Sequence, residues 1–290
     1  MNEYPLFIPF EDEHLAAVVT VPDEPPLGLV LLLTGTGAPR SHRFQLWTRT
    51  ARALVEHGLA SIRMDYRGIG DSTGRLLQPV LGDRRLDQAM RVAQAGMEIV
   101  ATRRLAAVGN CSGAIVALGV AAQVPECEAA ICILPRLVQL GGVNRAAMEA
   151  RKSKMAGFLR RSRLLRRAVT GTLTGTKDLP SEPVRRSFRP ALDHARVLFI
   201  YSRQDPDPYV EKSKRLLWHM AADLTPQRRE RLEIAITDAG PLAGFESLSV
   251  QEDSVQLVVN WLRDRFRAAS VMAEAGSGQR SRGPEDGVDP

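Results

Sequence analysis

The most regular feature of the chain is a series of short apolar runs that alternate with longer stretches of mixed polar and apolar residues. Apolar runs such as residues 29–33 and 129–134 indicate strands that are buried on both faces of a sheet. Strands are predicted at 6–10, 15–21, 29–33, 61–66, 105–108, 129–134, 196–201 and 232–236, and helices at 43–57, 84–100, 209–222 and 250–268, with a further helix beginning at 114. Strands that alternate with helices predict an α/β fold, with a mostly parallel central sheet flanked by helices.

The length and composition suit one large domain that carries an insertion. The 290 residues are 44% hydrophobic, which is enough for a sizeable core, and no apolar run approaches the roughly 20 residues needed to span a membrane. The first residues lack the basic and apolar regions of a signal peptide, and the three cysteines are odd in number and have no metal-ligand spacing. We therefore expect a soluble, cytoplasmic protein without disulfides or a metal site.

The positive charge of the chain is concentrated between residues 136 and 195. This stretch holds fourteen Lys or Arg against four Asp or Glu, whereas the formal charge of the whole chain is +6. It interrupts the strand pattern, and helices are predicted around 145–158 and 162–169. The expected organisation is a helical, basic lid at 136–195, core segments at 1–135 and 196–268, and a disordered tail at 269–290.

Residues 109–113, GNCSG, lie between the apolar run 105–108 and a helix of small residues. A strand, then five residues with glycine at both ends, then a helix is the layout of a nucleophile elbow. The glycines leave room for a sharp, strained turn on which the central residue is held. That central residue, usually serine, is Cys111, and Ser112 lies one position too late. The pattern predicts Cys111 as a nucleophile; the alternative is a small buried residue in an inactive elbow.

Four segments together resemble the α/β-hydrolase superfamily, over about residues 5–267 apart from the details of the lid. These segments are LTGTG at 33–37, RMDYRGIGDS at 63–72, the cysteine elbow, and IYSRQDP at 200–206. The resemblance implies the α/β-hydrolase fold. More narrowly, GAPRSHR at 37–43 together with a cysteine elbow is similar to hydrolases associated with exosortase and exopolysaccharide clusters.

The resemblance implies a role for each matching position. Cys111 matches the nucleophile, and Asp205, at the end of its strand, matches the triad acid, with Asp207 as a nearby rival. Asp71, in the glycine-rich loop, is expected to brace that loop rather than to perform chemistry. The implied oxyanion hole consists of the backbone N–H of Ser112 and that of Thr36 or Gly37.

The histidine of the triad is where this sequence departs from the family. It should follow the last strand, but the loop TDAGPLAGFE at 237–246 contains no histidine, and Gly240 or Pro241 occupies the expected place. Of the five histidines, only His42 lies near the predicted site, just beyond the oxyanion loop. His42 is therefore either a substitute base or a residue that braces its loop.

A cysteine depends less on a triad histidine than a serine does. At a reference pKa of about 8.5, a few per cent of a cysteine is already thiolate at neutral pH, and a helix amino terminus stabilises that charge. Such a thiolate can attack a thioester, whereas hydrolysis of the acyl-cysteine requires an activated water. The sequence thus predicts an acyl-thioester or ester hydrolase or acyltransferase, with acyl transfer favoured and no cofactor. The alternative is a catalytically impaired pseudo-hydrolase that binds an acyl ligand or an acidic carrier partner.

The basic segment predicts an anionic partner in addition to a small-molecule acyl substrate. Its runs RKSK at 151–154 and RRSRLLRR at 160–167 would attract an acyl carrier protein, the phosphates of coenzyme A or an anionic membrane surface. The alternative is a solvated helical face. Nucleic acid is not expected as a partner, because few aromatic residues are interleaved to stack on bases.

Overall fold

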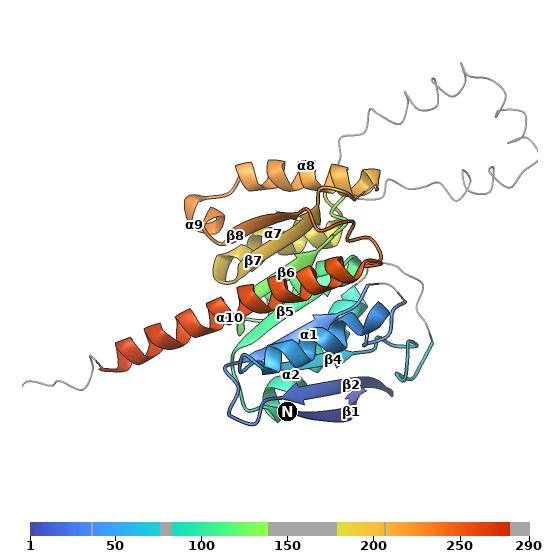
Figure 1. Ribbon diagram of the computed structural model, residues 1–290, viewed down its shortest axis with the longest axis vertical. Coiled ribbons are helices and arrows are strands. Elements are labelled where there is room, and N and C mark those ends of the chain that lie inside the picture. The colour runs from blue at the N-terminus through green and yellow to red at the C-terminus, as the bar shows by residue number, and fades with distance from the viewer. Residues whose placement is uncertain (36, 76–82, 139–178, 206, 279–290) are drawn as a thin grey trace, which may run out of the picture.

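The fold is described from a computed structural model, which places residues 1–35, 37–75, 83–138, 179–205 and 207–278, without the side chains of Asp83 and residues 269–278. In this part of the chain, eight strands form one sheet in the order β1-β2-β4-β3-β5-β6-β7-β8 (Figure 1). The pairs β1–β2 and β2–β4 are antiparallel, and all other neighbours are parallel. The strands are β1 (Asn2–Phe10), β2 (Glu13–Val21), β3 (Leu29–Leu33), β4 (Ala60–Met64), β5 (Leu105–Asn110), β6 (Cys127–Ile133), β7 (Arg196–Ser202) and β8 (Leu232–Thr237).

Helices cover both faces of the sheet. They are α1 (Leu46–Val55), α2 (Asp83–Ile99), α3 (Ser112–Gln123), α7 (Glu182–His194), α8 (Pro208–Ala222), α9 (Pro226–Arg229) and α10 (Leu248–Gly278), with a short 3₁₀ turn, η1 (Arg43–Gln45), before α1. One face carries α1 and α10, which lie side by side in front of the strands in Figure 1. The opposite face carries α2, α3, α7 and α8.

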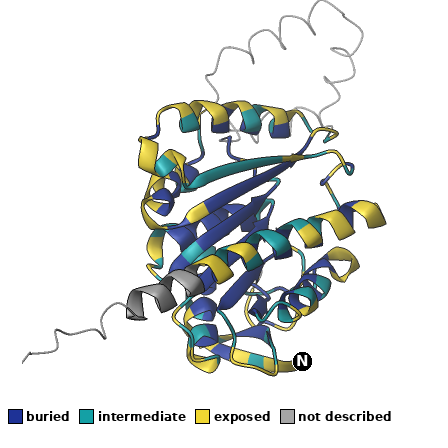
Figure 2. Ribbon diagram, turned by 60° about the vertical axis from the view of Figure 1, so that its left-hand side comes forward, coloured by how far each residue is buried: buried dark blue, intermediate teal, exposed yellow. Residues whose placement is uncertain are grey.

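The apolar runs of the parallel strands divide their side chains between two cores. In β3, Leu31 packs with the cluster under α2 and α3, whereas Leu32 packs with the cluster under α1 and α10. Alternate residues of a strand point to opposite faces, so a sheet covered on both sides needs apolar residues at every position. Figure 2 shows the result, with buried strands at the centre and helices exposed on their outer sides.

The predicted strands and most predicted helices are confirmed, and so is the mostly parallel sheet. Helix α7, by contrast, falls within the stretch predicted to be lid, but it packs against α3 in the core. Its Val184 and Phe188 are buried, whereas Arg185 and Arg189 are exposed. The basic residues thus occupy only the outer side of an amphipathic core helix. The last helix also continues to Gly278 instead of ending at residue 268.

The rest of the predicted lid lies outside the described residues. This holds for the helices expected around 145–158 and 162–169, and a lid over 139–178 stays a prediction. The end of the predicted tail, residues 279–290, also lies outside the description.

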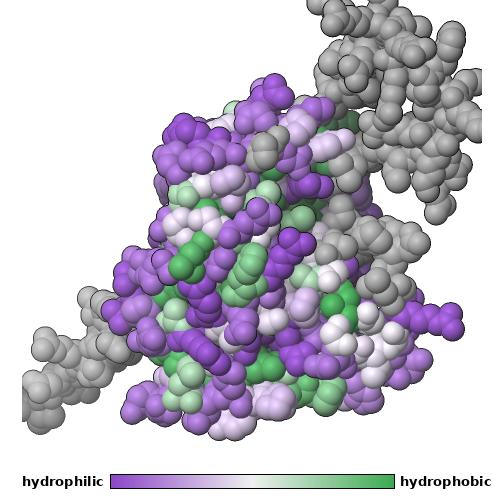
Figure 3. Space-filling model, turned by 45° about the vertical axis from the view of Figure 1, so that its right-hand side comes forward, coloured by the Kyte–Doolittle hydropathy of each residue, from purple (hydrophilic) through white to green (hydrophobic). Residues whose placement is uncertain are grey.

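The surface view in Figure 3 is mostly hydrophilic, with small, separated hydrophobic areas. No helix within the described residues has both the length and the apolar character needed to cross a membrane.

The parallel strands all end at the same edge of the sheet. The loops after β3, β5, β7 and β8 therefore meet there, as expected for the site of an open parallel sheet. This edge brings together residues from positions 34–35, 37–45, 111–112, 203–205 and 238–247.

Candidate active site

The turn between β5 and α3 has the geometry of a nucleophile elbow. Cys111 has φ 53° and ψ −117°, a backbone conformation that costs a residue with a side chain about 1–3 kcal/mol. A Cβ on Gly109 would fall on the carbonyl group of Gly113, and a Cβ on Gly113 would lie 2.5 Å from the carbonyl oxygen of Thr34. Both obstacles are backbone atoms, so glycine is required at each end of the turn. The half-exposed Cys111 thiol is thereby fixed at the carboxyl edge of the sheet.

Asn110, the residue before the cysteine, joins the elbow to the loop after β3. Its buried side chain accepts a hydrogen bond from Gly35 N at Oδ1 (3.0 Å), and its Nδ2 lies 3.0 Å from His42 Nε2. A Cβ on Gly35 would lie 3.3 Å from the Cβ of Cys111, so this loop packs directly on the nucleophile position. One amide side chain thus positions both ends of the loop that supplies the predicted oxyanion hole.

His42 is buried in this network and is neutral. Burial lowers the pKa of its imidazole, and a neutral ring carries one N–H. Asn110 Nδ2 donates to Nε2, which assigns the proton to Nδ1, 3.4 Å from the carbonyl oxygen of Arg43. The rings of Trp47 and Phe245 enclose the imidazole, with centroids at 5.6 and 5.4 Å.

The backbone around His42 is strained. His42, Phe44 and Gln45 all have positive φ, between 54° and 61°. The sequence predicts a helix that begins at residue 43, but because of these positive φ values regular α-helix begins only at Leu46. Such strain persists only where surrounding contacts fix the backbone, and here the hydrogen bonds of His42 and Asn110 do so.

The buried His42 makes stability depend on pH. Its folded pKa lies below the value of about 6.5 in an unfolded chain. The stability that depends on a neutral His42 is therefore fully present above about pH 6.5. It is lost as the pH falls below that value toward the folded pKa, at up to about 1.4 kcal/mol of unfolding free energy per pH unit. We expect the free energy of unfolding to fall from pH 7.5 to 5.5, and to fall less in His42→Gln. Urea unfolding of both proteins at the two pH values measures this; parallel pH curves would contradict it.

The predicted acid and its rival have different partners. Asp205 accepts backbone hydrogen bonds from Ala243 N at Oδ1 (3.0 Å) and from Ser202 N at Oδ2 (3.3 Å). Asp207 caps α8 by accepting a bond from Tyr209 N (2.9 Å), and it pairs with Arg136 (2.5 Å). Asp205 thus binds the backbone of the loop after β8, in which the family's triad histidine is missing. Asp207 instead caps α8 and pairs with Arg136.

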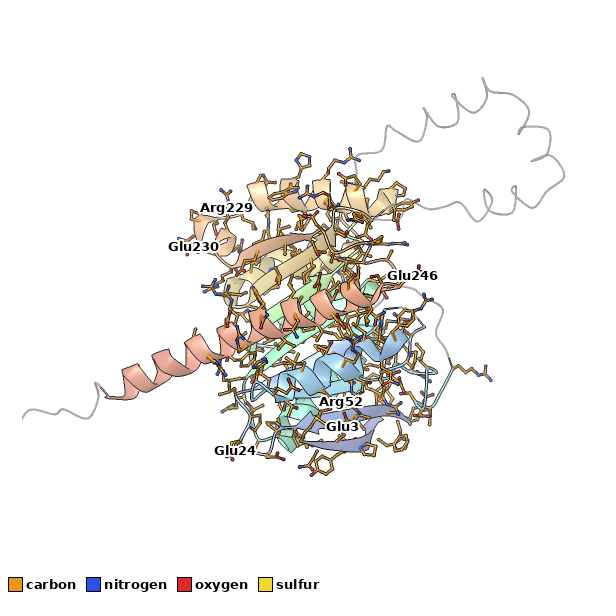
Figure 4. All side chains as sticks on the ribbon, viewed as in Figure 1. Glu3, Glu24, Arg52, Arg229, Glu230 and Glu246 are labelled. Atoms are coloured by element: carbon orange, nitrogen blue, oxygen red, sulfur yellow. The ribbon has the colours of Figure 1, made fainter. Side chains whose placement is uncertain are left out.

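The loop after β8 is closed by apolar side chains instead of a histidine. Leu242 and Phe245 are buried in the core under α1 and α10, and the Phe245 ring lies perpendicular to the His42 ring. Glu246, labelled in Figure 4, lies where this loop meets the start of α10. An aromatic contact to His42 and a backbone contact to Asp205 therefore fix the loop.

Two of the three residues predicted to form the oxyanion hole, Ser112 and Gly37, lie in the described part of the chain. Ser112 begins α3, so its N–H belongs to the first turn of that helix, beside Cys111. Gly37 is exposed with φ 77°, and no atom lies within 4 Å of a Cβ built on it. Thr36 lies outside the described residues.

The two other cysteines are buried and poorly suited to reaction. Burial raises the pKa of Cys127 to about 12 and that of Cys132 even further, and their thiols donate to the carbonyl oxygens of Ala129 (3.4 Å) and Ala114 (3.3 Å). Cys111 is the half-exposed cysteine of the three. Among the described residues, none forms a hydrogen bond with Cys111 Sγ, and none of their His, Cys, Asp or Glu side chains gather in threes that could hold a metal ion.

Asp71 braces its loop, as the sequence predicts. Arg40 bonds to Asp71 Oδ2 (2.7 Å), and its guanidinium also pairs with the buried Asp65. Asp71 N in turn donates to Asp65 Oδ2 (3.1 Å). This network ties the glycine-rich loop after β4 to the loop after β3.

Two residues of this region are absent from the sequence prediction. Asn110 lies inside the elbow pattern, where only the glycines and the central residue have a known requirement. Arg85, near the start of α2, donates to Ser112 Oγ (3.4 Å), although 27 positions separate the two residues. No spacing in the sequence indicates either contact.

Comparisons with known proteins support the architecture. No protein-family model matches the chain, and no curated protein matches it in sequence. An esterase from Pyrococcus furiosus is 16% identical, with a TM-score of 0.57 over 92% of this chain and 91% of that one. A proline iminopeptidase from Mycobacterium smegmatis is 16% identical, with a TM-score of 0.58 over 92% and 100%.

A third similar structure is that of Est1E from Butyrivibrio proteoclasticus with ferulic acid bound. It is 15% identical, with a TM-score of 0.58 over 90% of this chain and 99% of that one. At such low identity the likeness concerns the fold, and the narrower resemblance to hydrolases of exosortase clusters stays a prediction. Sheet order, elbow and structural neighbours agree on one conclusion: the chain has the α/β-hydrolase fold.

Proposed function

We propose that the protein acts on acyl thioesters or esters, with Cys111 as the nucleophile and acyl transfer as the favoured outcome. The observation that carries the proposal is the strained, half-exposed Cys111 at an elbow whose glycines have no room for a side chain. Strain of this kind is retained where it positions a reacting group. The esterases and peptidase among the structural neighbours support the same reaction class by analogy alone.

The proposed reaction has two steps. The Cys111 thiol first loses its proton to solvent, and the thiolate attacks the acyl carbonyl carbon. The new C–S bond forms as the carbonyl electron pair moves onto oxygen, which gives a tetrahedral oxyanion. Collapse of this intermediate then breaks the bond to the leaving thiolate or alkoxide, which takes a proton from water. The N–H groups of Ser112 and of Gly37 or Thr36 are proposed to bind the oxyanion. An acceptor thiol, alcohol or amine then attacks the acyl carbon, the C–S bond breaks, and the acceptor's proton passes through solvent to the released Cys111 thiolate.

Hydrolysis is proposed to be the slower outcome. It requires a base that removes a proton from the attacking water, and the loop after β8 contains no histidine. The Asp205 carboxylate is bonded to two backbone N–H groups. We assign it to holding this loop rather than to orienting a base.

His42 is proposed as a positioning residue. Its Nε2 lone pair accepts the hydrogen bond of Asn110, and its Nδ1–H faces the carbonyl oxygen of Arg43. The lone pair is therefore engaged in bracing the oxyanion loop and is not free to take a proton from Cys111. Acidic acyl carrier proteins and coenzyme A thioesters remain proposed acyl donors, drawn by the basic stretch 136–195.

The variant His42→Gln separates bracing from base catalysis. Glutamine keeps a hydrogen-bond acceptor for Asn110 but cannot act as a base. We expect the rate of Cys111 acylation to fall by less than about tenfold, whereas loss of a general base costs about 10²- to 10⁴-fold. Mass spectrometry of the acyl-enzyme in samples quenched at successive times gives the rate. A loss above a hundredfold, with folding intact by circular dichroism, would instead make His42 the base.

The direct test is incubation with acyl N-acetylcysteamine thioesters of different chain length, followed by intact and peptide mass spectrometry. The proposal predicts one acyl group per chain, located on Cys111, and its transfer to an added thiol. If no donor acylates the protein while acyl ligands still raise its melting temperature, the chain is the alternative, a pseudo-hydrolase that binds without turnover.

A further inference from the structure

Arg85 is fixed beside the elbow by two contacts. Its Nη1 donates to Ser112 Oγ (3.4 Å), and its guanidinium carbon lies 4.9 Å from the centroid of the Tyr66 ring. Tyr66 is buried in the loop after β4, at the same edge of the sheet. The guanidinium therefore lies between an aromatic face and the residue that directly follows Cys111.

No carboxylate pairs with Arg85 among the side chains that the structure describes, which do not include that of Asp83. Other arginines with limited exposure have a carboxylate partner: Arg40 pairs with Asp65, Arg63 with Glu3, Arg67 with Glu13 and Arg104 with Glu128. A guanidinium has five N–H donors in a planar fork that matches a carboxylate. The contact with Ser112 uses one of them, and no other hydrogen-bond acceptor meets the guanidinium among the described side chains.

Helix stability does not explain Arg85 either. It lies in the first turn of α2, where a positive charge opposes the helix dipole. The neighbouring Tyr66 hydroxyl, moreover, is buried without a hydrogen-bond partner among the described residues. That hydroxyl is enclosed, so the partly exposed guanidinium is the group that favours an oxygen-rich, negatively charged ligand at this point.

We propose that Arg85 binds a carboxylate on the acyl substrate and so determines its specificity. The substrate class is then a thioester or ester of a short dicarboxylic acid, whose reacting carbonyl lies at Cys111 while its free carboxylate meets the guanidinium. Arg85 contacts the residue next to Cys111, and this proximity is the reason to propose a short acyl chain. The substrate assignment rests on the proposed role of Cys111, whereas the anion site itself does not.

The first test compares alkylation of Cys111 by iodoacetate, which is anionic, and by iodoacetamide, which is neutral. We expect the ratio of the two rate constants to fall about tenfold in Arg85→Gln, the effect of one charged hydrogen bond. Arg85→Lys should keep part of the preference. Arg84→Gln, which removes the same charge from the exposed neighbouring position, should keep all of it. A ratio unchanged in Arg85→Gln, or an equal slowing of both reagents, would overturn the proposal.

The second test does not depend on Cys111 reactivity. In the Cys111→Ala background, isothermal titration compares monomethyl glutarate, which has a carboxylate, with the neutral dimethyl glutarate. We expect tighter binding of the acid, and loss of that preference when Arg85→Gln is added. If neither reagent alkylates Cys111 but the binding preference is present, the nucleophile proposal fails and the anion site stands. If Cys111 is alkylated without any Arg85-dependent preference in either test, the anion site fails alone.

Discussion

The variant Cys111→Ala should form no acyl adduct with any thioester or ester donor, a loss of at least about a hundredfold in acylation rate. The reason is that the sulfur of the partly exposed Cys111 is the atom proposed to bond to the acyl carbon. Mass spectrometry of the intact chain after a fixed incubation measures the loss. The matched control is Cys132→Ala, which should keep the adduct because the Cys132 thiol is buried and donates to Ala114 O.

The same position offers a test of the strain. Glycine tolerates the positive φ of residue 111, so Cys111→Gly should be more stable than Cys111→Ala by about 1 kcal/mol or more, although both are inactive. Urea unfolding compares the two. Equal unfolding free energies would mean that the backbone relaxes around alanine. An acyl adduct that still forms in either variant would show that another residue is the nucleophile.

Gly109→Ala should destabilise the fold by about 3 kcal/mol or more, the upper part of the range for overpacking a closed site. The new Cβ would meet the carbonyl carbon and oxygen of Gly113 and also lie 2.7 Å from the backbone nitrogen of Ala114. These atoms belong to the first turn of α3, so relief requires that the helix move away from β5. The expected result is a lower midpoint of urea unfolding together with loss of acylation.

The control for this variant is Gly37→Ala, at a glycine on the same edge of the sheet. Nothing lies within 4 Å of a Cβ at Gly37, so alanine there meets only the penalty of its positive φ, about 1–2 kcal/mol. Gly109 has no positive φ, so steric exclusion alone accounts for its larger effect. A smaller loss of stability for Gly109→Ala than for Gly37→Ala would show that the elbow can open without much cost.

Much of the fold follows from local patterns. The continuous apolar residues of β3 (Leu29–Leu33) identify a strand covered on both faces, and the glycine-bounded turn around Cys111 indicates an elbow before any contact is known. The boundary between core and lid in the basic stretch does not follow from charge along the chain, because charge does not show which side of a helix is buried. Helix α7 carries arginines outside and Val184 and Phe188 inside, and only its packing on α3 shows that it belongs to the core.

The sequence by itself determined the α/β architecture, the cysteine at the elbow and the absence of a histidine from residues 237–246. These are properties of strand periodicity, turn sterics and residue identity, which act over a few neighbouring positions. Only the tertiary structure decided which groups meet: Asn110 with His42, Asp205 with the backbone of Ala243, and Arg85 with Ser112. Those contacts join residues 27 to 68 positions apart, and they exist because parallel strands bring their ends to one edge. A side chain's partner at that edge is fixed by sheet order and loop path, which no local pattern encodes.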